Sequence, residues 1–149
     1  MRKAMLFVII AALAASASAQ LPGLRKRGPA QPAQPVLMGI DALRVDFIAR
    51  SGADTVYFGS DSAVLGLPAK ATLAAQAQWL LQHPELVVRI EGHADPSDTR
   101  DHALAVGARR AVEVRDYLVL LGVPAAQLSA TSWGKERPGA GRAVTVLVR

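Results

Sequence analysis

The amino-acid sequence predicts an α/β (α+β) fold, a two-layer sandwich whose helices cover one face of a single mixed β-sheet. Segments rich in β-branched and aromatic residues alternate with two longer segments of helical period, and two strand-like segments follow one another at the end. This strand, helix, strand, helix, strand, strand order is typical of helices packed on one sheet. With 149 residues, of which 51% are hydrophobic, the chain can form one packed domain and not comfortably two.

Residues 1–19 are expected to be a signal peptide. A short basic start, "MRK", precedes an unbroken apolar run from Ala4 to Ala15, and small residues follow before Gln20. The alternative is a membrane anchor that is retained, but the apolar run is shorter than the roughly 20 residues that a spanning helix needs. The sequence therefore predicts an exported protein that is cleaved near Gln20.

A flexible linker is expected over residues 20–39, which are rich in proline, glutamine and alanine, and the folded domain is expected over residues 40–149. The sequence has no cysteine, so it offers neither a disulfide nor a lipid-modified cysteine at the cleavage site, and a soluble mature product is expected.

The basic charge of the chain is concentrated in its first residues. Without Arg2 and Lys3, 15 basic residues remain against 12 acidic ones, and the run Arg25–Arg27 accounts for that excess. The basic isoelectric point is therefore no sign of a nucleic-acid-binding face. The basic run could instead touch anionic polymers of the cell envelope.

The first half of the domain contains two expected elements and one doubtful segment. Residues 41–50 alternate weakly and are expected to form a short strand or a turn. The segment Asp54–Ser60 is β-branched and aromatic and predicts a strand. A helix is expected to start near Pro68, which suits a first turn, and to end at Pro84. Within it, Trp79 is expected to serve packing.

The second half contains three strands and a long helix. Residues Glu85–Gly92 predict a strand, and a helix is expected from about Arg100 to Leu121 because apolar residues recur at helical spacing. The third strand is expected within residues 125–134, and the fourth over Arg142–Arg149.

The long helix has two stripes of interest. Its expected core face consists of residues 104, 108, 111, 115, 118 and 121, all apolar except Arg115. A second stripe contains Ala103, Val106 and Arg110, and it is expected to lie outside the core, beside the loop that precedes the helix.

Asp95 in that loop and Arg110 on the second stripe could flank a shallow binding site. Such a pair suits a zwitterion, because the arginine can bind a carboxylate with two hydrogen bonds while the aspartate binds an ammonium group. Free N–H groups at the helix start would also favour the carboxylate. The alternative is that the two side chains pair with each other or cap the helix.

Three motifs occur in a recognisable order: "EGHAD" at Glu91–Asp95, "ARRA" at Ala108–Ala111 and "GKERP" at Gly134–Pro138. With "VYFGSDS" before them and "RAVTVLV" after them, the sequence resembles the OmpA-like C-terminal domain family, and most closely its peptidoglycan-associated lipoprotein branch. The resemblance runs from about Thr55 to the C-terminus.

The resemblance implies non-covalent binding of the diaminopimelate-containing stem peptide of peptidoglycan. In the family the aspartate of "GHxD" meets the amino-acid end of diaminopimelate, and here it is Asp95. The second arginine of "RRA" meets its carboxylate, and here it is Arg110. Asp61, preceded by Ser60, would wall the pocket, and Val106 holds the family's apolar position. The resemblance also implies the periplasm of a Gram-negative bacterium and allows an association with the outer membrane.

Three departures from the family pattern concern the expected site. Ala103 stands where the family usually has asparagine, which removes a possible hydrogen bond of about 1 kcal/mol. Ser60 stands where an aromatic residue is common. The loop before Arg142 is cut to "GAG", so the site should be more open on that side.

Two other classes of site are disfavoured by the sequence. His93, Asp95, Asp98, Asp101 and His102 crowd one segment, but no histidine pair has the i, i+4 spacing of a helical zinc motif, so no metal is predicted. The sequence contains no cysteine nucleophile and no G-x-S-x-G elbow, so neither an enzyme nor a cofactor is predicted.

The main rival to peptidoglycan binding is a domain that keeps the fold, has lost the site and contacts another envelope protein. The resemblance implies partners of the Tol system for such a surface. Ala103 and the shortened loop favour the rival, whereas the retained Asp61, Asp95 and Arg110 favour peptidoglycan binding, which is the prediction.

Overall fold

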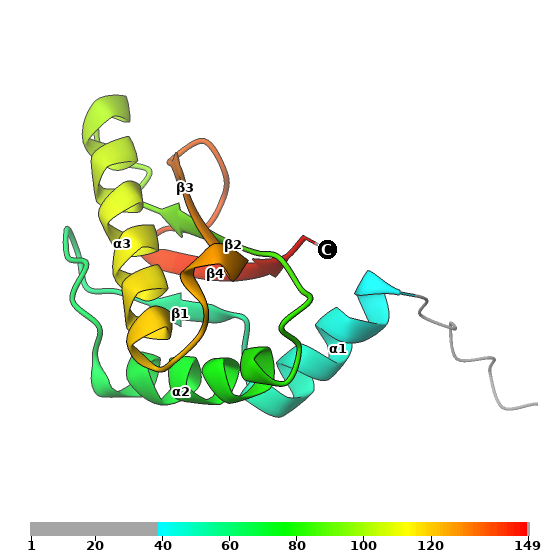
Figure 1. The fold of residues 1–149 in the computed structure, drawn as a ribbon. Coiled ribbons are helices and arrows are strands. Elements are labelled where there is room, and N and C mark those ends of the chain that lie inside the picture. The colour runs from blue at the N-terminus through cyan, green and yellow to red at the C-terminus, as the bar shows by residue number, and fades with distance from the viewer. Residues whose placement is uncertain (1–38, 149) are drawn as a thin grey trace, which may run out of the picture. The chain divides into compact units, whose positions relative to one another are not determined.

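A computed structural model describes residues 39–148, and the expected signal peptide and most of the expected linker lie outside these residues. Three helices and four strands follow one another, with a short 3-10 helix before the third strand (Figure 1). Their bounds are α1 Ile40–Ser51, β1 Thr55–Tyr57, α2 Leu67–Leu81, β2 Val88–His93, α3 Arg100–Leu120, η1 Ala125–Gln127, β3 Leu128–Gly134 and β4 Arg142–Leu147. The predicted order of strands and helices is confirmed from β1 onward.

The sheet is single and mixed, as predicted. Its strand order is β1-β4-β2-β3, with β2 and β3 parallel and the other neighbours antiparallel. Helix α3 makes the crossover between the two parallel strands, and its length suits a connection of that kind. In Figure 1, α3 stands beside the sheet and α2 runs below it.

The core lies between the sheet and the helices. Alternate strand residues such as Val88 and Ile90 are fully buried, and Leu73 and Leu80 of α2 pack into the same cluster. Trp79 is 2% exposed, so its predicted packing role is confirmed. In the part of the chain that the structure describes, no helix is both long and apolar enough to span a membrane.

Helix α1 corrects the prediction of a strand or turn over residues 41–50. Ile40, Leu43 and Phe47 recur at spacings of three and four, so they form one apolar stripe that packs on the core. The weak alternation of neighbouring residues concealed this period. Two tertiary hydrogen bonds hold the helix: Trp79 donates to Asp46, and Arg44 donates to the carbonyl of Leu147.

The Asp46 carboxylate should titrate below its ordinary range. Trp79 Nε1 donates to it over 2.8 Å, and Arg50 Nε donates to it over 2.9 Å. Both hydrogen bonds lower the pKa of Asp46, and the bond from Trp79 has the larger effect. Its stabilising effect should therefore be present above about pH 4 and be lost as the pH falls through the lowered pKa. An NMR titration of the Trp79 indole N–H should show a midpoint below that of free aspartate, and Asp46→Asn should remove the transition. A midpoint at or above about pH 4 would contradict the described contact.

The buried face of α3 differs from the predicted one. Its buried residues are Ala103, Val106, Gly107, Arg110, Ala111, Val114 and Leu118. The helix is therefore turned so that the second stripe, expected outside the core, faces inward. One cause is a close backbone approach between α3 and β2, because a Cβ atom on Gly92 would lie 1.8 Å from the Gly107 carbonyl oxygen. The pattern of apolar residues does not indicate this contact, because glycine has no side chain.

Candidate functional site

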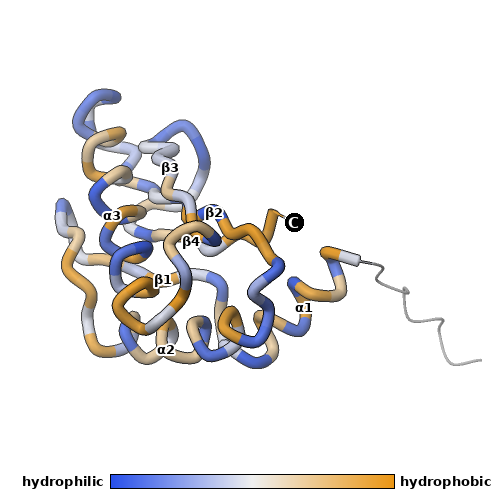
Figure 2. The backbone as a smooth tube through the Cα atoms, in the orientation of Figure 1, coloured by the Kyte–Doolittle hydropathy of each residue, from blue (hydrophilic) through white to orange (hydrophobic). Residues whose placement is uncertain are grey.

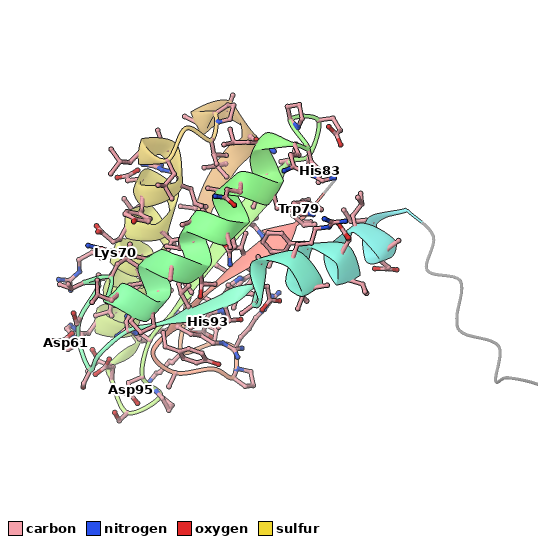
Figure 3. The ribbon with its side chains drawn as sticks, turned by 90° about the horizontal axis from the view of Figure 1, so that it is seen from below. Asp61, Lys70, Trp79, His83, His93 and Asp95 are labelled. Carbon is pink, nitrogen blue, oxygen red and sulfur yellow. The ribbon has the colours of Figure 1, made fainter. Side chains whose placement is uncertain are left out.

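The candidate site lies where β2 ends and α3 begins. Asp61 and Asp95 are at the same end of the domain, away from Trp79 and His83 (Figure 3). The tube around the start of α3 is largely hydrophilic, as is the hairpin between β3 and β4 (Figure 2). Backbone and side-chain hydrogen bonds from three separate segments determine the positions of the site residues.

The loop between β2 and α3 carries Asp95 and is held at both ends. The Ala94 N–H donates to the carbonyl of Gly134 over 2.8 Å, and Lys135 Nζ donates to the carbonyl of Asp98. Thr99 caps α3, where its hydroxyl accepts the N–H of His102. The predicted helix start is thus confirmed, and Asp95, which is half-buried, projects from a constrained loop.

The loop between β1 and α2 carries Asp61 in an unusual backbone conformation. Its φ is +49°, and among the described residues it is the only non-glycine with a positive φ. Aspartate tolerates this left-handed region better than most residues, but it still costs about 1–2 kcal/mol. The side chain is 63% exposed, and Ser60 beside it is exposed as well.

Arg110 connects the two loops from beneath. Its Nε donates to the carbonyl of Ser62 over 2.7 Å, Nη2 to that of Gly59 over 2.9 Å, and Nη1 to that of His93 over 2.7 Å. The residue is only 2% exposed. A guanidinium has five N–H groups, so two remain for another acceptor. The side chain that the sequence placed on an outer stripe is therefore a buried linker between the β1–α2 loop and the end of β2.

Three carboxylates surround the Arg110 charge. Burial lowers the pKa of Arg110, while Asp95, Asp61 and Asp98 act in the opposite direction. No carboxylate of the described residues lies within ion-pair distance of the guanidinium, so the alternative in which Asp95 and Arg110 simply pair is wrong. The site thus combines acidic side chains at the surface with a positive charge below them.

Val106 lies inside rather than on the surface. It is 2% exposed and packs with Ala94 and Ala103 in a small apolar cluster of its own. It can support the site from below. Its role as an apolar wall that touches a ligand stays a prediction, as do the ligand contacts expected of Ser60.

The hairpin between β3 and β4 reaches the site. Besides the Lys135 contact, Arg100 of α3 pairs with Glu136 over 2.8 Å. The segment then folds back, where Arg142 Nη2 donates to the carbonyl of Pro138 over 2.8 Å. The Lys135 bond ties the hairpin to the loop that carries Asp95, and the Glu136 pair ties it to the first turn of α3.

His102 also lies at this site, although the sequence suggested it only as a possible metal ligand. Its Nε2 lies 2.8 Å from Asp61 Oδ1. Helical spacing offered a signal, since His102 lies one turn before Val106 on the flank that faces the Asp61 loop. Among residues 39–148, no group of three or more acidic, histidine or cysteine side chains could hold a metal ion.

His93 is buried on the opposite side of β2 from Gly92. It is 2% exposed, and this burial lowers the pKa of its imidazole. The charges of Arg142 and Arg137 lower the pKa further, whereas the charge of Glu91 raises it. Its carbonyl, not its ring, serves the site, because that carbonyl accepts from Arg110. His93 therefore contributes through the backbone alone.

Comparisons with known proteins find relatives of similar sequence. Curated relatives include the peptidoglycan-associated lipoproteins of Rhizobium meliloti (strain 1021), 48% identical over 93 residues, and of Pseudomonas aeruginosa, 43% identical over 99 residues. These matches cover 62% and 66% of this chain and 52% and 58% of the relatives. The chain thus spans little more than half the length of these curated relatives.

Solved structures with the same fold include a crystal structure of the peptidoglycan-associated lipoprotein from Burkholderia pseudomallei. It has a TM-score of 0.62 and 37% identity, and the match covers 65% of this chain and 92% of that one. The C-terminal domain of Helicobacter pylori MotB, at 20% identity and a TM-score of 0.58, is similar in fold alone; 64% of this chain and 84% of that one are covered.

The match to the OmpA family extends over residues 57–146, from β1 to β4. It includes the positions of Asp61, Asp95 and Arg110 and leaves out α1. Because it covers more than half of the chain, this chain belongs to the OmpA family.

Proposed function

We propose that this domain binds peptidoglycan non-covalently, through the diaminopimelate of its stem peptide, in the periplasm of a Gram-negative bacterium. The observation that carries the proposal is the arrangement of Asp61 and Asp95 at the surface above the buried cation of Arg110. The names of the relatives, which state an association with peptidoglycan, support the same ligand class.

The chemistry of the site suits the free amino-acid end of diaminopimelate. Its ammonium group would bind the Asp95 carboxylate, and its carboxylate would accept the N–H groups that Arg110 leaves free. The start of α3 offers further backbone N–H groups for an anion. Binding of this kind needs no covalent step, and a non-enzymatic role in organising the envelope follows.

Asp95 is the residue whose loss should affect binding most directly. Arg110 is buried and also holds the two loops, so changing it would mix binding with folding. Asp95 is half-buried, and no hydrogen bond of its side chain is found within residues 39–148. Its carboxylate is therefore free to bind a ligand without breaking an internal contact.

We expect Asp95→Asn to weaken sedimentation with diaminopimelate-containing sacculi by about tenfold or more. An ammonium group bound by a carboxylate contributes roughly 1.5–3 kcal/mol, and asparagine keeps the size but not the charge. Asp116→Asn, at the far end of α3, is the matched control and should bind as the wild type does. Circular dichroism should show that all three proteins are folded. Equal sedimentation of Asp95→Asn and wild type would overturn the assignment of Asp95.

A second comparison tests the ligand itself. Peptidoglycan with lysine in place of diaminopimelate lacks the second carboxylate, so the wild type should bind it clearly less well than diaminopimelate-containing sacculi. Equal binding to both materials would exclude diaminopimelate as the group recognised.

A protein partner is the alternative function, and one surface favours it. Val64 and Leu67 are 76% and 83% exposed beside the Asp61 loop, which is unusual for large apolar side chains. Close by, Ala63 and Val112 contribute to a shallow groove of about 390 Å³ that Arg109 borders. If the wild type fails to sediment with both kinds of peptidoglycan, a partner from the envelope, such as a component of the Tol system, becomes the better proposal.

A further inference from the structure

We propose that His102 is a positioning residue of the peptidoglycan site, which orients the Asp61 carboxylate and makes ligand binding depend on pH. This inference rests on the proposed function of the site and adds a residue to it. It is carried by the His102–Asp61 contact and by the backbone conformation of Asp61.

The contact joins two segments that are far apart in the sequence. His102 lies in the first turn of α3, and its Nε2 is 2.8 Å from Oδ1 of Asp61 in the β1–α2 loop. The side chains are 44% and 63% exposed, so the pair lies at the surface where a ligand can reach it. An imidazole that donates to one carboxylate oxygen leaves the other oxygen for a ligand.

Hydrogen bonds on both sides of Asp61 fix the backbone of its loop and thereby the direction of its carboxylate. Arg110 binds the carbonyls of Gly59 and Ser62, which flank Asp61 on both sides. Asp61 itself keeps a φ of +49° between them. Strained backbone of this kind persists where the surrounding contacts demand it. Arg110 thus fixes the backbone of the loop, and His102 fixes the side chain.

Charged groups from several elements lie around His102. From the loops, Asp61, Asp95 and Asp98 face this end of α3, and Lys135 reaches it from the hairpin. On the helix itself Asp101 is adjacent, while Arg100 pairs with Glu136. Further along, Arg109 follows on the same flank and Arg110 lies below. Acidic and basic groups therefore both lie around the imidazole, and Asp61 is the one in direct contact with it.

A proton on His102 would place a positive charge directly on Asp61. This charge would partly neutralise Asp61 and repel a ligand ammonium group bound at Asp95. Histidine is the side chain whose charge ordinarily changes between about pH 5 and 8. Affinity should therefore be highest near pH 8 and fall toward pH 5.5.

The test is calorimetric titration of the full chain with a soluble stem tripeptide that ends in meso-diaminopimelate, between pH 5.5 and 8. Wild-type affinity should fall roughly two- to fivefold toward pH 5.5, as expected for an exposed pair of this size. His102→Gln keeps a donor of similar reach without a titrating charge. It should bind within about twofold of wild type at pH 8 and stay flat across the range. His102→Ala should bind more weakly than the wild type near pH 8, and its affinity should also stay flat across the range.

His83→Gln is the matched control, because His83 lies at the opposite end of the domain (Figure 3), and it should keep the wild-type slope. Circular dichroism at both pH limits checks that each protein stays folded. The inference is overturned if His102→Gln keeps the wild-type slope, or if the wild type binds equally at all pH values. If the wild type binds at no pH, the proposed function fails and the inference fails with it.

Discussion

Arg110→Ala is expected to lower the free energy of unfolding by about 3–5 kcal/mol. The substitution removes three hydrogen bonds and leaves the carbonyls of Gly59, Ser62 and His93 without their donor. It also opens a cavity, because Arg110 is among the largest fully buried side chains of the described residues. Urea denaturation followed by circular dichroism would measure the loss.

Two further variants make the Arg110 result specific. Arg110→Lys keeps the charge but not the planar array of donors, so its stability should fall between those of the alanine variant and the wild type. Arg109→Ala changes the exposed neighbouring arginine and should stay within about 0.5 kcal/mol of wild type. Wild-type stability of Arg110→Ala would mean that the guanidinium does not hold the two loops. Any loss of peptidoglycan binding would then report on the ligand contact alone.

Gly92→Ala should be the second severe change, with a loss of about 3 kcal/mol or more. The added Cβ would lie 1.8 Å from the Gly107 carbonyl oxygen and 2.8 Å from its carbon, both backbone atoms of α3. Relief requires the helix to move away from β2, which also separates Arg110 from the His93 carbonyl. Stability and peptidoglycan binding should therefore fall together.

The matched control for this change is Gly66→Ala. The added Cβ there would meet only Pro68 Cδ at 3.7 Å, and the backbone is in the extended region. A loss below about 1 kcal/mol is expected. Thermal denaturation of the two variants side by side separates the general effect of replacing a glycine from the effect of the clash with α3. A Gly92→Ala protein as stable as the Gly66→Ala protein would contradict the described approach of α3 to β2.

The order of elements from β1 to β4 could be predicted because each carries a local signal. Proline and glycine mark the ends of these segments, and β-branched residues or helical spacing mark their interiors. Helix α1 could not be recognised in this way. Its apolar stripe of Ile40, Leu43 and Phe47 is short, and its position depends on tertiary bonds to Trp79 and Leu147.

The orientation of α3 was decided by contacts that no apolar pattern records. A pattern counts Arg110 as an outer residue, but backbone carbonyls from the β1–α2 loop and the end of β2 satisfy its donors and allow it to be buried. It counts Gly92 and Gly107 as neutral, although their missing side chains let the helix approach the strand. The predicted core face is therefore only partly right: Ala111 and Leu118 are buried as expected, but Arg110 of the second stripe is buried with them.

For the site, the sequence by itself determined which residue types are available: Asp61, Asp95 and Arg110, in motifs typical of one family. Only the tertiary structure decided the role of each residue, because it buries Arg110 as a support beneath the two loops that carry Asp61 and Asp95. It alone brings His102 to Asp61, across 41 positions of the chain. Such contacts depend on the folded path of the backbone, whereas the local sequence determines only the chemistry that each residue can offer.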